Sequence, residues 1–167
     1  MTMTVSDNLA TTLYQFRGAF YMLLSRAFSR ELDQDAVKGM EQVSKSLMEI
    51  WEILQIPSSP DVQAGKTLLE SFFAELGQES ADEEVEKLAA EYASLFLGVG
   101  SKTVSPCESV YRSNSGMLYQ SALFEVQQVY SESGMAKNDQ YSESDDHISV
   151  ELMYMAGLCE MTQEAGK

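Results

Sequence analysis

The sequence has few of the residues from which metal centres and disulfide frameworks are built. Its 167 residues include one histidine and two cysteines, Cys107 and Cys159, without a Cys-x-x-Cys pair. Zinc hydrolases and carboxylate-bridged di-iron bundles normally need two or more histidine ligands, and the two cysteines lie too far apart in sequence to form the spacing of a zinc site. The sequence therefore predicts no disulfide and no zinc or iron site, and it favours reduced thiols in a cytosolic protein.

Basic residues and long apolar runs are also scarce. The 11 Lys and Arg residues face 26 Asp and Glu residues, for a formal net charge of −15. Nucleic acids and anionic membranes are bound mainly through Lys and Arg, so neither partner is expected. There is no apolar run of about 18 residues and no signal-peptide pattern at the N-terminus, which predicts a cytoplasmic protein without membrane insertion. The acidity either favours a cationic partner or serves solubility alone.

Proline occurs only three times, and the long segments between the prolines carry apolar residues every three or four positions. This period is typical of amphipathic helices, and no alternating pattern predicts a sheet. We expect helices over residues 9–28, 37–54, 68–76, 82–96, from near 117 to around 134, and 148–161. The sequence thus predicts an all-α, single-domain bundle of about six helices over residues 1–167.

Two polar segments interrupt the helical pattern, at residues 98–114 and 135–147, and function is expected there. The second segment places the only histidine, His147, directly after several carboxylates. One interpretation is a functional site. The other is that Ser144 or Asp145 caps the last helix while the remaining acids are solvated. For the first segment, a recognition surface and a loop that merely covers the core are both open.

No catalytic signature is present. The chain has no Gly-x-Ser-x-Gly elbow, and the segment Leu97–Thr103 fails the spacing of a phosphate-binding loop because Ser101 separates Gly100 from Lys102. A magnesium or calcium site of carboxylates has too loose a pattern to recognise. We therefore expect a protein that is not an enzyme and that has no catalytic residues and no metal.

Four short motifs carry a resemblance to a known family. They are Tyr-x-x-Leu-Phe at 92–96, Gly-Val-Gly at 98–100, Pro-x-x-Ser-Val-Tyr at 106–111 and Glu-x-x-Asp-His at 143–147. In this order and approximate spacing, the chain is similar to the TorD/DmsD family of cytoplasmic, all-helical chaperones. These chaperones are dedicated to maturing molybdopterin oxidoreductases of the dimethyl sulfoxide and trimethylamine N-oxide reductase type.

The resemblance implies a partner and a role. The partner is the apoprotein of a molybdopterin oxidoreductase, bound through its twin-arginine signal peptide. The role is to assist insertion of the molybdenum cofactor and to delay export. Two departures stand out: Ser144 replaces the proline that usually follows the first Glu of the last motif, which should make this loop less rigid, and the chain stops at Lys167 where the family usually continues. A chain truncated at the C-terminus and a helix-swapped dimer are therefore expected alternatives, beside a monomer.

A receptor for this peptide needs carboxylates beside an apolar groove, because Arg forms bidentate, charge-assisted bonds with carboxylates. The resemblance and this requirement together give the expected client-binding residues, with His147 expected to line the groove. They are Glu143, Asp145, Asp146, His147, Pro106, Glu108, Ser109, Tyr111, Tyr92 and Phe96.

Two other functions remain open. One is a guanine-nucleotide-binding regulator with weak hydrolysis, since guanine nucleotides have been associated with the family; weak GTP binding is then expected, and otherwise no cofactor. The other is a non-catalytic helical subunit or interaction protein.

Overall fold

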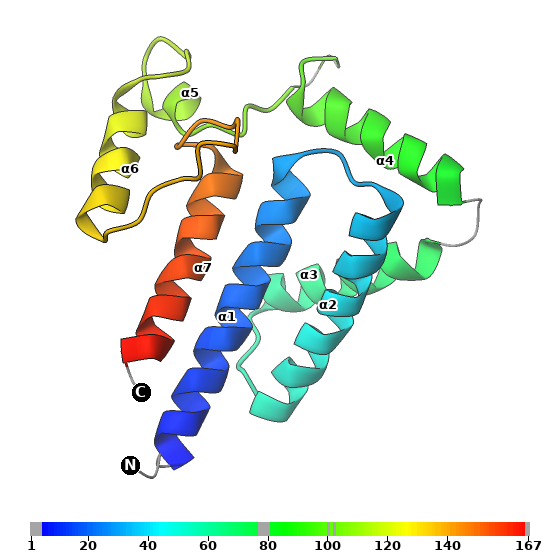
Figure 1. Ribbon diagram of the computed structural model, residues 1–167. Coiled ribbons are helices and arrows are strands. Elements are labelled where there is room, and N and C mark those ends of the chain that lie inside the picture. The colour runs from blue at the N-terminus through cyan, green and yellow to red at the C-terminus, as the bar shows by residue number, and fades with distance from the viewer. Residues whose placement is uncertain (1–4, 77–80, 100, 102, 166–167) are drawn as a thin grey trace. The chain divides into compact units, whose positions relative to one another are not determined.

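The computed structural model describes residues 5–76, 81–99, 101 and 103–165, and all regular elements in these residues are helices (Figure 1). The predicted all-α class is confirmed. In chain order the helices are α1 (Val5–Ser29), α2 (Gln34–Leu54), α3 (Pro60–Glu75), α4 (Ala81–Phe96), α5 (Ser109–Arg112), α6 (Ser121–Glu132) and α7 (Ile148–Ala165). The described residues thus hold one helix more than expected, the single turn α5. None of these helices combines the length and the apolar character needed to cross a membrane.

The chain divides into two compact units. The terminal unit combines α1 with α5, α6 and α7, and the middle unit contains α2, α3 and α4. Because the terminal unit is built from both ends of the sequence, its contacts join residues far apart in the chain. The expectation that residues 1–167 form a single domain stays a prediction.

In the terminal unit, α1 and α7 lie side by side and run in opposite directions (Figure 1). They pack closely at Gly18, where a Cβ would still lie at an ordinary contact distance, 3.5 Å, from the Cβ of Cys159. On α1 the buried residues Phe16 and Leu23 belong to the predicted apolar stripe, whereas the buried side chains of α7 lie outside the stripe predicted for that helix. The helix expected from residue 117 begins at Ser121, and the Tyr130 ring of this helix lies 4.6 Å from the Tyr154 ring of α7. The buried apolar side chains of the terminal unit are Phe16, Leu23, Cys107, Ala122, Leu123, Tyr130, Val150, Ala156 and Cys159.

In the middle unit, α3 begins eight residues before its apolar stripe. Pro60 occupies the first helical turn, where a missing N–H costs nothing, and the Ser59 hydroxyl accepts a hydrogen bond from the Val62 amide (3.3 Å). The helix therefore starts at a capping signal and not at residue 68. At the end of the unit, Gly98 follows α4 with a φ of 76°, and the third residue of its motif, Gly100, lies outside the described residues.

Candidate functional site

Two segments of the terminal unit meet where α7 begins. Residues 106–109, which lead into α5, and residues 143–149, which lead into α7, are joined by an isolated antiparallel β-bridge. The Glu108 amide donates to the Asp146 carbonyl (2.9 Å), and a second backbone bond of 2.8 Å crosses the same bridge. We call these two segments together the motif junction, since two of the four motifs meet here.

Asp146 is the buried centre of the motif junction, with no exposed surface. Its Oδ2 accepts a hydrogen bond from the Ser109 amide (2.9 Å), and its Oδ1 accepts one from the Ser144 hydroxyl (2.5 Å). Burial alone would raise the pKa of this carboxyl, but the bonds from Ser109 and Ser144 outweigh burial and hold the pKa below its ordinary value. Ser144, at the position where the family usually has proline, thus donates a hydrogen bond to this buried carboxylate, and the expected lower rigidity of the loop stays a prediction.

His147 is buried beside Asp146, with 2% of its surface exposed. Its Nδ1 accepts a hydrogen bond from the Ser149 amide (3.1 Å), so the ring proton belongs on Nε2, which lies 3.7 Å from Glu143 Oε2. Burial lowers the pKa of His147 and outweighs the opposing charges of Glu143 and Asp146. The imidazole is therefore neutral near pH 7. Asp146 and His147 are thus both buried in the terminal unit, and that His147 lines a client groove stays a prediction.

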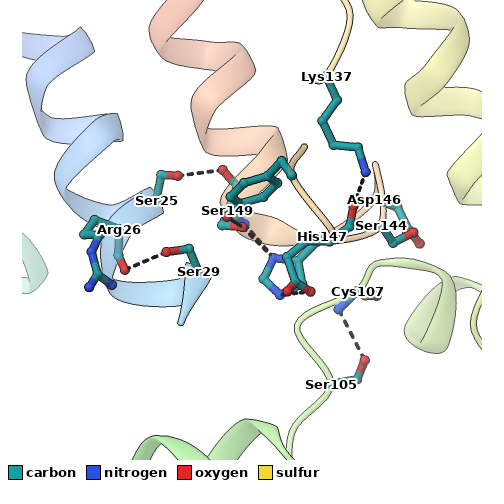
Figure 2. Close-up of polar contacts among 12 residues, drawn as sticks. Ser25, Arg26, Ser29, Ser105, Cys107, Lys137, Ser144, Asp146, His147 and Ser149 are labelled. Carbon is teal, nitrogen blue, oxygen red and sulfur yellow. Dashed lines mark hydrogen bonds and ion pairs between the residues drawn. The ribbon is translucent and has the colours of Figure 1, made fainter. Parts of the chain in front are cut away.

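A chain of hydroxyl groups connects His147 to α1. The Ser149 hydroxyl lies 2.7 Å from His147 Nδ1 and 3.0 Å from the Tyr141 hydroxyl. The Ser149 carbonyl accepts a hydrogen bond from the Ser25 hydroxyl (2.7 Å), and Figure 2 shows Ser25 on α1 pointing across to the start of α7. The motif junction is thus tied to the helix pair that forms the centre of the terminal unit.

Three further carboxylates surround the buried pair, and two of them are open to solvent. Asp145 is mostly covered, because it accepts a hydrogen bond from Gln127 (2.5 Å) and lies 3.4 Å from Lys137 Nζ. Glu108 and Glu143 each expose about a third of their side chains, at 34% and 38%. Of the predicted acidic residues, these two are the ones that a cationic partner could reach.

Glu151, in the first turn of α7, is partly buried near the carboxylates of the motif junction. Burial, followed by the charges of Glu108 and Asp146, raises the pKa of Glu151 to about 7. A cation near this point would relieve the repulsion. Among the described residues, no group of three or more His, Cys, Asp and Glu side chains could hold a metal ion.

The buried thiol of Cys107 lies within the same junction. Burial, followed by the charges of Asp146 and Glu143, raises the pKa of Cys107 to about 11. A thiol with such a pKa is protonated at neutral pH and is a poor nucleophile. Cys107 is itself one of the two residues that form the β-bridge.

The predicted aromatic residues fall into different units. Tyr111 follows the motif junction on α5, is exposed, and donates a hydrogen bond to the Ser105 carbonyl (2.8 Å). Tyr92 and Phe96 lie on α4 in the middle unit, where their ring centroids are 5.0 Å apart. The terminal unit therefore brings together Pro106, Glu108, Ser109, Tyr111, Glu143, Asp145, Asp146 and His147. That Tyr92 and Phe96 join this site stays a prediction.

Several residues that hold the motif junction were missed by sequence reasoning. Ser25, Gln127, Lys137 and Tyr141 are polar residues without a recognisable pattern, and each acts through a partner distant in sequence or in a loop. Ser149 could have been found, because a hydroxyl two residues after a histidine at a helix start is close enough to reach the ring.

A pocket of about 340 Å³ opens beside the junction, between α6, α7 and the loop that joins them. Its walls include Tyr130 and Tyr154, whose ring centroids are 4.6 Å apart, together with Met135 and Met153. Lys137 lines the same pocket and donates to the Glu143 carbonyl. The pocket is therefore apolar, with its one cation held by the motif junction.

Comparison with known proteins gives a consistent set of relatives. The family model of the nitrate reductase delta subunit matches residues 57–167. The chaperone protein TorD of Shewanella pealeana is 30% identical over 159 residues, which cover 90% of this chain and 68% of the relative. TorD of Escherichia coli is 27% identical over 150 residues, which cover 90% of this chain and 68% of that protein. A crystal structure of an Archaeoglobus fulgidus protein assigned to redox enzyme maturation matches with a TM-score of 0.56 and 26% identity, covering 86% of this chain and 72% of the other.

Proposed function

Since this chain belongs to the TorD/DmsD family of molybdoenzyme maturation chaperones, we propose that it binds the twin-arginine signal peptide of a molybdopterin oxidoreductase apoprotein in the cytoplasm. It would hold the apoprotein while the molybdenum cofactor is inserted and so delay export. The observation that carries the proposal is the family membership, and the motif junction supplies acidic groups suited to the peptide.

The electrostatics of the motif junction support a cationic peptide as ligand. Glu108 and Glu143 are open to solvent, and the charges of Glu108 and Asp146 add to the effect of burial in raising the pKa of Glu151. A guanidinium group forms paired hydrogen bonds with a carboxylate, which an ammonium group does not. An Arg-Arg pair should therefore bind more tightly here than a Lys-Lys pair.

Binding without catalysis is the second part of the proposal. Cys107 is protonated and buried, and His147 is neutral and engaged with Ser149, so neither is placed to act on a bound peptide. Weak GTP binding remains a separate prediction.

Isothermal titration calorimetry with three synthetic peptides tests the proposal. The peptides carry Arg-Arg, Lys-Lys or Ala-Ala before the same apolar stretch, and we expect the affinity to fall in that order. The double variant Glu108→Gln with Glu143→Gln should weaken binding of the Arg-Arg peptide about two- to tenfold, as for partly exposed charge pairs. Its matched control, Glu49→Gln with Glu70→Gln, removes the same charge from the middle unit and should bind as the wild type does. Equal affinity for all three peptides would contradict recognition of the arginines.

A second candidate is a lasting reductase subunit, because the matching family model is that of a nitrate reductase delta subunit. The two candidates differ in the mature enzyme. A chaperone is released after cofactor insertion, whereas a subunit remains. Purification of the cofactor-loaded reductase from the native organism, followed by mass spectrometry for this chain, separates them.

A further inference from the structure

The terminal unit exposes a group of large apolar side chains on the segment that contains α5 and the start of α6. Single exposed apolar residues are common, but several within 14 consecutive residues form the kind of patch that marks an interaction site. We call this group the exposed patch. Its members, which are between 43 and 66% exposed, are Tyr111, Met117, Leu118, Tyr119 and Phe124.

The backbone of this segment is fixed, and one of its residues is strained. Tyr119 has a φ of 59°, in the left-handed region that costs a residue with a Cβ about 1 kcal/mol or more. The Gln120 side chain donates to the Leu118 carbonyl (2.9 Å), and the Gly116 amide donates to the Ser113 carbonyl (3.4 Å). The segment therefore keeps a destabilising conformation that leaves its apolar side chains in solvent, as strained segments at binding sites do.

The exposed patch is also attached to the motif junction. The Gln120 amide donates to the Ser109 hydroxyl (3.2 Å), while the Ser109 amide donates to Asp146. Buried Asp146 thus positions, through Ser109, the point at which the segment turns into α6. Hydrogen bonds through Ser109 therefore connect the motif junction to the exposed patch within the terminal unit.

The edge of the exposed patch is acidic. Glu108 and Glu125 both lie close to one guanidinium nitrogen of Arg112, at 3.4 and 2.7 Å. Their spacing therefore suits a guanidinium group. Two carboxylates and one cation leave a negative balance at this edge, in a chain whose net charge is −15. Like charge disfavours a second copy of this chain on the patch, whereas a segment that carries cations ahead of apolar residues complements it.

We propose that the exposed patch binds the apolar stretch of the client's signal peptide, with Glu108 and Glu125 facing the arginines that precede this stretch. The inference rests on the proposed function and adds to it the surface on which the peptide lies. Within the motif junction, Asp146 then holds the platform and Glu108 faces the arginines, while the exposed patch contacts the apolar stretch.

A double-mutant cycle tests the inference. The protein variant is Leu118→Ser with Phe124→Ser, and the control is Met22→Ser with Met161→Ser, which removes comparably exposed side chains from α1 and α7. One peptide carries Arg-Arg and a leucine-rich stretch of about ten residues, and the other carries Arg-Arg and the same stretch replaced by serines. The patch variant should weaken binding of the leucine peptide by about tenfold or more and that of the serine peptide by less than about twofold. The control should bind both peptides as the wild type does.

A second variant guards against loss of folding. Asn adopts the left-handed region more readily than Tyr, so Tyr119→Asn should leave the melting temperature unchanged or slightly higher. It should still weaken binding of the leucine peptide several-fold, because it removes an exposed aromatic ring.

The outcomes separate the inference from the proposed function. A wild-type protein that binds neither peptide would overturn both. A wild type that binds the leucine peptide, with the patch variants binding it equally well, would overturn the inference alone. A wild-type dimer that becomes monomeric in the patch variants without a change in peptide affinity would make the patch an interface between copies and would also overturn the inference.

Discussion

A buried residue that carries no net charge can still be sensitive to pH, and His147 is such a residue. Its Nδ1 accepts a hydrogen bond from the Ser149 amide, and burial keeps the pKa of the imidazole below the ordinary value of 6.5. We expect His147→Gln to lower the free energy of unfolding by about 1–3 kcal/mol at pH 7.5. The glutamine side chain would leave the buried partners of the imidazole, the amide and hydroxyl of Ser149, poorly paired. Urea unfolding followed by circular dichroism measures this change.

The sign of the pH dependence follows from the direction of this shift. A histidine whose pKa is lower in the folded state binds its proton more readily when unfolded, so wild-type stability falls as pH drops below about 6.5. The cost of His147→Gln should therefore shrink at pH 5.5. Tyr141→Phe is the control, since it removes a hydroxyl next to Ser149 without removing a titrating group. An unchanged free energy of unfolding in His147→Gln would contradict the buried role.

Glu151 should show the opposite pH dependence. Its pKa is raised to about 7 in the folded protein from an ordinary value of 4.5, first by burial and then by Glu108. The folded state therefore binds the proton more tightly, and stability falls as pH rises from about 4.5 through 7. Glu151→Gln abolishes this loss and should be more stable than the wild type by about 1–2 kcal/mol at pH 8, after allowance for partial exposure, with no gain at pH 4. Melting temperatures across this range test the prediction, and parallel pH profiles of the two proteins would refute it.

At the scale of helices, the sequence predicts the elements that carry an apolar stripe. On α1 the stripe marks the buried face, since Phe16 and Leu23 belong to it. The helix α7 was also predicted, but apolar residues occur on most of its faces, and the residues that it buries lie outside the predicted stripe. The first turns of α3 escape this pattern, since they begin at the Ser59 cap and Pro60 before any stripe. The single turn α5 escapes it too, because four residues are too few to show a period.

The motif junction was predictable in its members but not in its burial. Asp145 and Asp146 are neighbours with the same side chain, and nothing in their order says that the first faces Gln127 and Lys137 while the second is enclosed. The difference depends on Ser109, whose amide reaches Asp146 across the β-bridge from a distant segment. Such long-range pairing decides which carboxylate becomes the fully buried centre and which lies nearer the surface, beside Gln127 and Lys137.

The two ends of the chain form one unit at the scale of the whole molecule. The bond between Ser25 and Ser149 joins residues 124 positions apart, so this part of the terminal unit forms only when α7 reaches α1. Long-range contacts of this kind slow folding, because loop closure must precede them. The motif junction is tied to α1 through the bond between Ser25 and Ser149, and the exposed patch is attached to the motif junction. The geometry of both therefore depends on the assembled pair of α1 and α7.

The net charge of −15 belongs to the whole molecule and should govern how a cationic peptide approaches it. Charge of one sign accelerates encounter with a ligand of the other sign, and salt screens this attraction over about 10 Å at 0.1 M ionic strength. We expect the association rate of the Arg-Arg peptide to fall at least several-fold between about 0.05 and 0.5 M NaCl. The rate for the Ala-Ala peptide should change much less, while the dissociation rates of both should respond weakly, because apolar contacts are not screened. Stopped-flow fluorescence with labelled peptides measures these rates, and equal salt dependence for the two peptides would show that the charge of this chain does not steer its ligand.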